Sequence, residues 1–215
     1  MKPTLSEHER RRLDLRVAET EMRTGTQIVL SVIQRSDAYA ELLWKAFALG
    51  ASVAGLILLL LHRRLHDWYP DASALIVVVG ILACGALLAL LTVMMPRFAK
   101  LFLPDYRAEV EVQQYAKALF LERELFATRQ RTGILLLVSL FEHRVVFLPD
   151  KGLRERLTED DVSNMLAAMT PLLKRKQIAA AFDASLDYLS RVLTTTSPDL
   201  HKDELPNDII EEVGV

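Results

Sequence analysis

The sequence predicts a small α/β sandwich domain that is interrupted by a hairpin of two membrane-spanning helices. Two observations favour this fold class. Hydrophobic residues make up 51% of the chain while 25% of residues are charged, so the apolar residues must be concentrated in particular segments. Outside the two longest apolar segments, helical patterns alternate with short apolar strands, as they do in domains whose helices cover both faces of a sheet.

Two segments are long and apolar enough to cross a bilayer as helices. Leu42–Leu61 carries only Lys45, near its start, and Ala72–Met95 carries no charge. A helix needs about 20 apolar residues to cross the hydrocarbon layer. The alternative, a pair of buried core helices, would require far more surrounding protein than this chain contains. We therefore expect a transmembrane hairpin.

Charged and aromatic residues near the hairpin predict its orientation. Five Lys and Arg residues lie near the membrane ends of the flanking segments, against two, Arg63 and Arg64, in the connecting loop, which favours the cytoplasmic side for the flanks. The two arginines suit lipid headgroups, and Trp68 and Tyr69 are typical anchors at the membrane interface. The charged N-terminal segment does not fit a cleaved secretory signal. The expected location is the inner (cytoplasmic) membrane, with the globular domain in the cytoplasm.

The other elements are predicted in chain order from their caps and periodicity. The first helix has a capping box from Ser6 to Glu9 and a stop at Gly25, and Gln27–Ile33 follows as a central strand that is apolar on both faces. After the hairpin we expect a helix from Asp105, strands over Ile134–Leu140 and Val145–Leu148 joined by a short polar turn, and helices that begin at Thr158 and Ile178.

These elements imply four regions. We expect residues 1–40 to hold the first helix and strand of the α/β domain, residues 41–97 the transmembrane hairpin with spans 42–61 and 72–95, residues 98–196 the remainder of the domain, and residues 197–215 an acidic disordered tail. The tail has six acidic residues from Asp199 onward against one Lys, and it lacks a stripe of apolar residues that could join a core. The alternative is that it folds onto a partner.

One stretch carries a family resemblance. "AKALFLERELFATRQRTGILLLVSLFEHRVVFLPDKGL", Ala116 to Leu153, has a helix that ends in Thr, an Arg-Thr-Gly lead into an apolar strand, a turn with an acid and a base, a second strand and a small-residue elbow. In this pattern, and in Glu19 to Tyr39, the chain resembles the TPM domains, named for a thylakoid lumen protein, a photosystem II repair protein and a modulator of nematode acetylcholine receptors. It is similar to the membrane-anchored bacterial type.

The resemblance implies an α/β/α sandwich and leaves three roles open. Some TPM domains have been credited with acid phosphatase activity, some bind divalent cations such as calcium through acidic residues at the sheet edge, and others assemble or modulate membrane complexes. This sequence differs from the common family pattern in two respects. Its anchor is internal, and the elbow, often rich in glycine, reads Pro149 to Gly152 here.

Asp37 and Asp150 are candidate metal ligands. Each follows an apolar strand, so if the two strands run parallel their carboxylates meet at one sheet edge, where ligands of open α/β sheets bind. Two carboxylates could help to hold Ca²⁺ or another divalent cation. The alternative is that Asp37 caps the next helix and that Asp150 forms a turn with Gly152.

Thr128, Arg131 and Thr132 are candidate contacts for an anion such as phosphate, because they precede the second strand together. The sequence has no glycine-rich phosphate loop, so the alternative is a solvated loop that enters the sheet. Glu142 and His143 are interpreted as a polar turn, since neighbouring strand residues point to opposite faces.

We therefore predict a membrane-tethered, non-catalytic domain that binds or modulates a membrane protein complex, with the bilayer and a membrane protein as partners. The alternative is a phosphatase of low specificity that is assisted by a divalent metal. No cofactor is established by the sequence, and Ca²⁺ or another divalent cation is the candidate. A net charge of -2 gives no indication of nucleic-acid binding, and the single Cys84 excludes an intramolecular disulfide.

Overall fold

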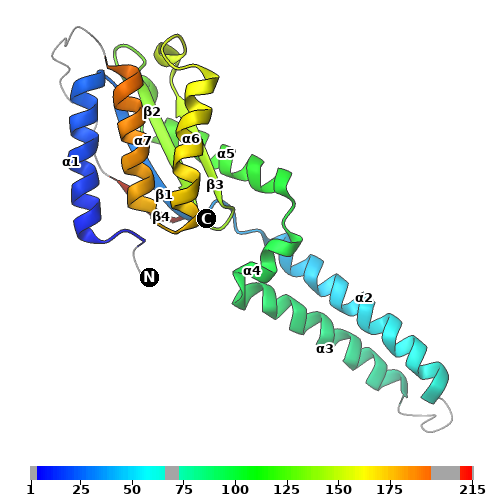
Figure 1. Ribbon diagram of the computed structural model, residues 1–215. Helices are drawn as coiled ribbons and strands as arrows, with labels where there is room; N and C mark the ends of the chain where they lie inside the picture. Colours follow the sequence, from blue (N-terminus) through cyan, green and yellow to red (C-terminus); the bar gives the residue numbers. More distant parts are fainter. Residues whose placement is uncertain (1–3, 66–72, 195–208, 215) are drawn as a thin grey trace. The chain divides into compact units, whose positions relative to one another are not determined.

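The computed structural model describes residues 4–65, 73–194 and 209–214. The chain divides into two compact units (Figure 1). The globular unit comprises Met1–Ser36 and Glu109–Val215, and the hairpin unit comprises Asp37–Ala108. The divisions at 36/37 and 108/109 lie outside the expected hairpin limits of 41 and 97, because the hairpin unit also includes the segments that lead into and out of its helices.

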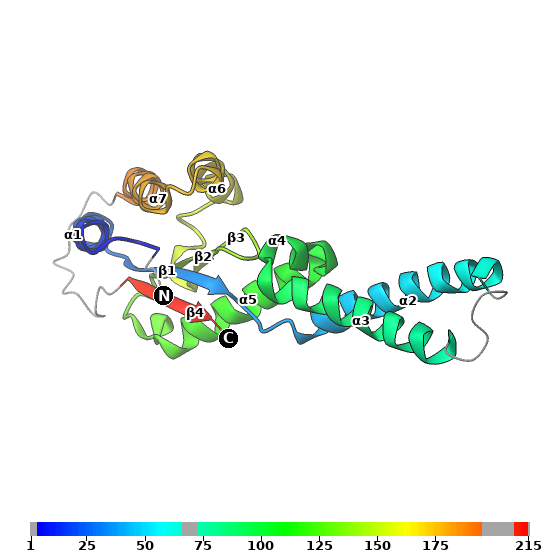
Figure 2. The same ribbon diagram turned by 90° about the horizontal axis from the view of Figure 1, so that it is seen from below.

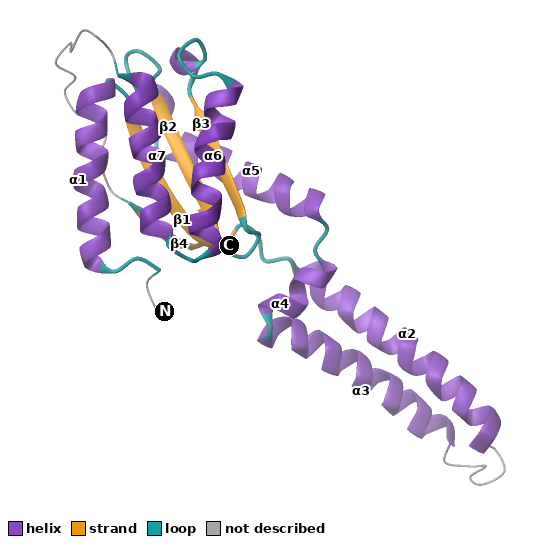
Figure 3. Cartoon of the chain, in the orientation of Figure 1, coloured by secondary structure: helices purple, strands orange, loops and turns teal. Residues whose placement is uncertain are grey.

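The globular unit contains a four-stranded sheet with the order β3-β2-β1-β4 (Figure 3). Its strands are β1 (Gln27–Arg35), β2 (Gly133–Ser139), β3 (Arg144–Pro149) and β4 (Ile210–Gly214). Strand β1 runs parallel to both β2 and β4, and β3 returns antiparallel to β2. The two longer strands are central, as their continuous apolar sequences predict.

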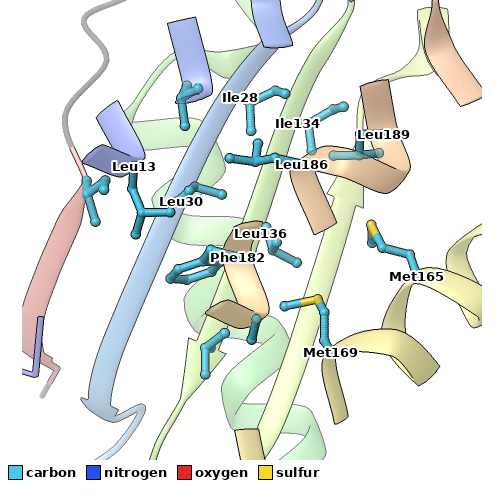
Figure 4. Close-up of a cluster of buried hydrophobic side chains, with 14 of the residues drawn as sticks. Leu13, Ile28, Leu30, Ile134, Leu136, Met165, Met169, Phe182, Leu186 and Leu189 are labelled. Atoms are coloured by element: carbon cyan, nitrogen blue, oxygen red, sulfur yellow. The ribbon is translucent and has the colours of Figure 1, made fainter. Parts of the chain in front are cut away.

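Helices cover both faces of this sheet, which confirms the α/β/α sandwich. Figure 2 shows α1 (Glu7–Thr24), α6 (Glu159–Lys174) and α7 (Ile178–Leu193) on one face, and α5 (Asp105–Glu122) on the other. The alternation of β1 side chains explains the two layers. Ile28 and Leu30 pack with Phe182 of α7 in the first layer, shown in Figure 4. Val29 and Ile33 pack under α5 in the second.

The expected helix caps are present. Ser6 and Glu9 form a capping box, and Gly25 ends α1 in the left-handed conformation with φ 67°. Thr158 and Asp161 form a second capping box at the start of α6. The strands of the β2–β3 hairpin differ from expectation by one residue at all four ends, where hydrogen bonding and not residue type sets the limit.

The prediction of a disordered tail is wrong for residues 210–214, which form the edge strand β4. Its register places Ser31 opposite Ile210 and Ile33 opposite Glu212. The strand forms because Ile209 and Ile210 are buried, one against each layer of the core, and because both of its glutamates have partners. Residues 197–208 and 215 of the expected tail lie outside the described residues.

The hairpin unit consists of α2 (Ala40–Leu65) and α3 (Ser73–Met94), followed by α4 (Pro96–Ala99) and the short 3₁₀ turn η1 (Lys100–Phe102). The stretches Ala40–Leu61 and Ala74–Met94 are long and apolar enough to span a membrane.

The two long helices approach closely at glycines. A Cβ atom on Gly50 would lie 2.9 Å from the carbonyl oxygen of Cys84, and one on Gly85 would lie 2.8 Å from the Phe47 ring. Of the expected interface residues, Arg63 and Arg64 fall in the last turn of α2, while Trp68 and Tyr69 lie outside the described residues.

Candidate functional site

The expected pairing of Asp37 with Asp150 is contradicted by the direction of the strands. Strand β3 is antiparallel to β2, which is parallel to β1, so β1 and β3 run in opposite directions. Pro149 pairs with Ile134, beside the start of β1, and Asp150 therefore follows β3 at that end of the sheet. Asp37 follows β1 past its other end. The two carboxylates do not share a sheet edge.

Asp150 does meet the candidate anion residues, and together they form what we call the Arg131 junction: Thr128, Arg131, Thr132, Asp150 and Gly152. The Asp150 side chain is 5% exposed. Its Oδ1 accepts hydrogen bonds from Arg131 Nη2 at 3.1 Å and from the Lys151 amide at 2.7 Å. Its Oδ2 lies 2.8 Å from Arg131 Nε as an ion pair, although the N–H is not aligned for a hydrogen bond.

The two threonines of the junction are buried and bonded within the protein. Thr128 Oγ1 accepts a hydrogen bond from the Thr132 amide at 2.9 Å, and Thr132 Oγ1 donates to the carbonyl oxygen of Gly25 at 3.2 Å. The Arg131 guanidinium, which already faces Asp150, also lies 5.9 Å from the centre of the Phe126 ring. The hydroxyls and the guanidinium are therefore directed at other protein groups.

Glycine is required where the two loops of the junction meet. A Cβ atom on Gly152 would lie 2.1 Å from the Gln130 carbonyl oxygen, and the Gly152 amide donates to Arg131 O at 2.9 Å. A Cβ atom on Gly133 would lie 2.2 Å from the Leu125 carbonyl oxygen. Backbone contacts this close hold the loop before β2 against the loop after β3. The turn interpretation of Asp150 and Gly152 fits this geometry.

A second polar cluster lies at the opposite end of β1 and β2, and sequence reasoning missed it. The buried carboxylate of Glu142 accepts hydrogen bonds from the Ser36 amide at 2.9 Å and the Ser36 hydroxyl at 2.7 Å, and also from the Ser139 hydroxyl. The turn itself was predicted, and His143 adopts the positive φ of 54° that such a turn requires. The one available signal was a serine at the end of each of two neighbouring strands.

Asp37 has separate surroundings in the hairpin unit. Its Oδ1 accepts a hydrogen bond from the Ala38 amide at 2.7 Å, and its Oδ2 lies 3.6 Å from Arg107, which also pairs with Glu41 at 3.4 Å. Among the residues that the structure describes, no three His, Cys, Asp or Glu side chains are grouped as a metal site would need. Asp37 thus acts with basic and backbone groups of its own unit.

The glutamates of β4 form the third group of buried or half-buried charges. Glu211 accepts hydrogen bonds from Arg10 Nη2 at 2.7 Å and from the Thr4 amide. Burial by itself would raise the Glu211 pKa, but these bonds outweigh it and lower the pKa from its usual value. On the other face, the Tyr115 hydroxyl donates to Glu212 at 2.6 Å. Burial and this bond raise the Tyr115 pKa.

Comparisons with known proteins agree with this architecture. Residues 92–192 match the family model described as the TPM domain. Over 98% of this chain and 97% of the other, the fold matches the NMR structure of the BA42 protein from the psychrophilic bacterium Bizionia argentinensis, with a TM-score of 0.59 and 13% sequence identity. At that identity the match shows the fold alone. A search of curated proteins found no match.

Proposed function

We propose, because this chain carries a TPM domain, that it is a membrane-anchored, non-catalytic binding or assembly module for a membrane protein complex. The observation that carries the proposal is the Arg131 junction. The residues with the right chemistry for a phosphate or a cation, Thr128, Arg131 and Asp150, are engaged with one another and with the backbone. A catalytic site needs such groups aimed at a space where substrate can bind.

Membrane anchoring is supported by the hairpin unit. Its two long helices are apolar over lengths of 22 and 21 residues, and few of those residues are buried. Trp44 near the start of α2 is 71% exposed, and Phe98 and Phe102 pack edge to face just after α3. Aromatic side chains at this level suit the membrane interface, where basic residues such as Lys100 also belong. The excess of basic residues on this side favours the cytoplasm for the globular unit.

Isolation of the intact protein from its own membrane tests the proposal. We expect a membrane protein complex to be recovered with it in a fixed ratio, both from the unchanged chain and from Asp150→Asn, because the partner surface does not depend on the junction. A matched sample with Arg154→Met, an exposed arginine in the segment after β3, controls for changes in surface charge near Asp150.

A phosphatase assay tests the alternative on the same preparations. We expect no turnover of a generic phosphate ester with Ca²⁺, Mg²⁺ or Mn²⁺. Turnover by the unchanged chain that Asp150→Asn abolishes while the fold is retained would contradict a non-catalytic role, and recovery of no complex in a fixed ratio would contradict a binding role.

A further inference from the structure

We infer that the outer edge of β1 is a strand-addition site for a partner protein, and that β4 occupies this edge in the free protein. The inference rests on the proposed binding function and names the chemistry of the partner. The partner segment is extended, runs parallel to β1, and carries two apolar residues followed by two acids. Figure 2 shows β4 beside β1, at the edge of the sheet.

Strand β4 occupies only the second half of the edge. Its register with β1 runs from Ser31 opposite Ile210 to Arg35 opposite Gly214. In the first half, the buried carboxylate of Glu21 accepts a hydrogen bond from the Ile28 amide at 2.7 Å, in the place where a neighbouring strand would accept it. This side chain prevents a longer strand from pairing along the whole edge. The site therefore takes a short segment of about the length of β4.

The positions that receive the β4 side chains differ on the two faces of the sheet. Ile209 enters the core layer of α1 and α7, and Ile210 enters the layer of α5. Beyond them, Glu211 meets Arg10 and the Thr4 amide on the first face. Glu212 meets the Tyr115 hydroxyl at 2.6 Å and Arg123 at 3.7 Å on the second. On each face, the edge therefore has a position that accepts an apolar side chain, followed by a position where a basic residue and a hydrogen-bond donor receive an acid.

The last position of the site selects glycine. Gly214 has φ 78°, and a Cβ atom there would lie 1.5 Å from the Arg35 carbonyl oxygen. An L side chain is strained at this φ and has no space at this point. The pattern that fits is therefore apolar, apolar, acid, acid, any residue, glycine, which is the order of "IIEEVG" from Ile209 to Gly214.

Exchange of β4 for a partner segment is physically reasonable because its charge contacts are partly exposed. The outer pair, Arg123 with Glu212, is 42% and 43% exposed on its two sides, and pairs of this kind contribute little stability. Glu211 is 6% exposed, so a partner segment must supply an acid to replace it beside Arg10. Edge pairing through backbone hydrogen bonds, with side-chain pockets for specificity, is a recognised mode of peptide binding. Attachment to the same chain gives β4 an effective concentration on the order of millimolar, so a free segment must compete with it.

The test uses the purified full chain in detergent and a fluorescent synthetic peptide with the sequence of residues 207–215. The variant Glu211→Lys with Glu212→Lys places positive charge against Arg10 and Arg123, so its own β4 is repelled. The matched control, Asp203→Lys with Glu204→Lys, makes the same change of charge outside β4. We expect the variant to bind the peptide at least about tenfold more tightly than the unchanged and control chains. A peptide with both glutamates replaced by lysine should not bind.

Each other result contradicts the inference. Equal peptide affinity in the three chains would contradict it. Unchanged hydrogen-exchange protection of residues 210–214 in the variant would also contradict it, because the charges would then not hold β4. If the variant does not fold, a chain with an inserted protease site between Leu193 and Ile209 is cut and mixed with labelled peptide. This chain keeps all of its residues, so failure of the peptide to exchange overturns the inference.

The result is separable from the test of the proposed function. Peptide exchange without recovery of a membrane complex would leave the β1 edge as a binding site and remove the proposed function. Recovery of a complex without peptide exchange would support the proposed function and place its surface elsewhere.

Discussion

The ion pair of the Arg131 junction predicts unequal costs for removing its two members. Asp150 is 5% exposed at its side chain, whereas Arg131 is 46% exposed. Arg131→Met leaves a buried carboxylate with only the Lys151 amide as donor, and we expect a loss of about 3 kcal/mol in the free energy of unfolding, at the lower end for a broken buried pair. Asp150→Asn leaves a guanidinium that water can reach, with an expected loss of about 1.5 kcal/mol for the charged hydrogen bonds.

The measurement must report on the globular unit. Trp44 and Trp68, the tryptophans of the chain, both fall between residues 37 and 108, so tryptophan fluorescence follows the hairpin unit. Hydrogen exchange of the β2 and β3 amides is suited instead, because the slowest amides report global unfolding. Arg154→Met, an exposed arginine in the segment after β3, is the control, with an expected change within about 0.5 kcal/mol.

Two further measurements complete this experiment: the stability of the Arg131→Met, Asp150→Asn double variant, and the effect of Ca²⁺ on the unchanged chain. With both members replaced, the loss should fall below the sum of the single losses by about 1 kcal/mol or more, since the two groups are in contact. Equal costs for the two single variants would refute the reasoning from burial. Protection of the unchanged chain by millimolar Ca²⁺ that is lost in Asp150→Asn would show that Asp150 binds a cation, contrary to a purely structural role.

Three other predictions follow from single contacts. Gly152→Ala should destabilise the globular unit by about 1–3 kcal/mol through the clash with Gln130 O, measured by the same exchange, and no loss would mean that the two loops can separate. Thr158→Ala should cost about 1 kcal/mol by removing the α6 capping box, with Thr158→Ser as the matched control that keeps it. Because the folded pKa of Glu211 is below the usual 4.5, its stabilising contribution to β4 is present above pH 4.5 and is lost as pH falls through the folded pKa. Protection of residues 210–214 should therefore fall in acid, and less so in Glu211→Gln.

Local patterns predicted most of the fold because its strands and helices are long enough to show them. The strand that begins at Gln27 is apolar on both faces, and the Ser6 and Thr158 caps mark helix starts directly. The short turn after Ser139 predicted a hairpin, and a hairpin requires antiparallel strands. The direction of β1 relative to β2 was not predicted, and it is their parallel pairing, together with the hairpin, that separates Asp37 from Asp150.

Strand β4 could not be predicted, because the information that forms it is distant in the sequence. Five residues are too few to show a period, and "IIEEV" does not alternate. Its acids look like a solubilising end until their partners are known, and those partners are 201 residues away at Arg10 and 97 residues away at Tyr115. Local composition indicates only that the acids of this segment favour water. It does not show that folding brings them against Arg10 and Tyr115.

Two of the buried carboxylates in the globular unit, Glu142 and Asp150, lie at opposite ends of the sheet and indicate where binding can occur. Glu142 joins the ends of β1 and β2 through Ser36 and Ser139, and Asp150 joins the loops at the other end through Arg131. In many open α/β sheets the carboxyl ends of the strands are left for a ligand. In this protein, one buried acid at each end of the sheet accepts hydrogen bonds from other residues of the globular unit. A ligand at either end would have to displace those hydrogen bonds, which hold loops to strands. The outer edge of β1 differs because its occupant, β4, is held in part by the Arg123–Glu212 pair, whose two side chains are 42% and 43% exposed.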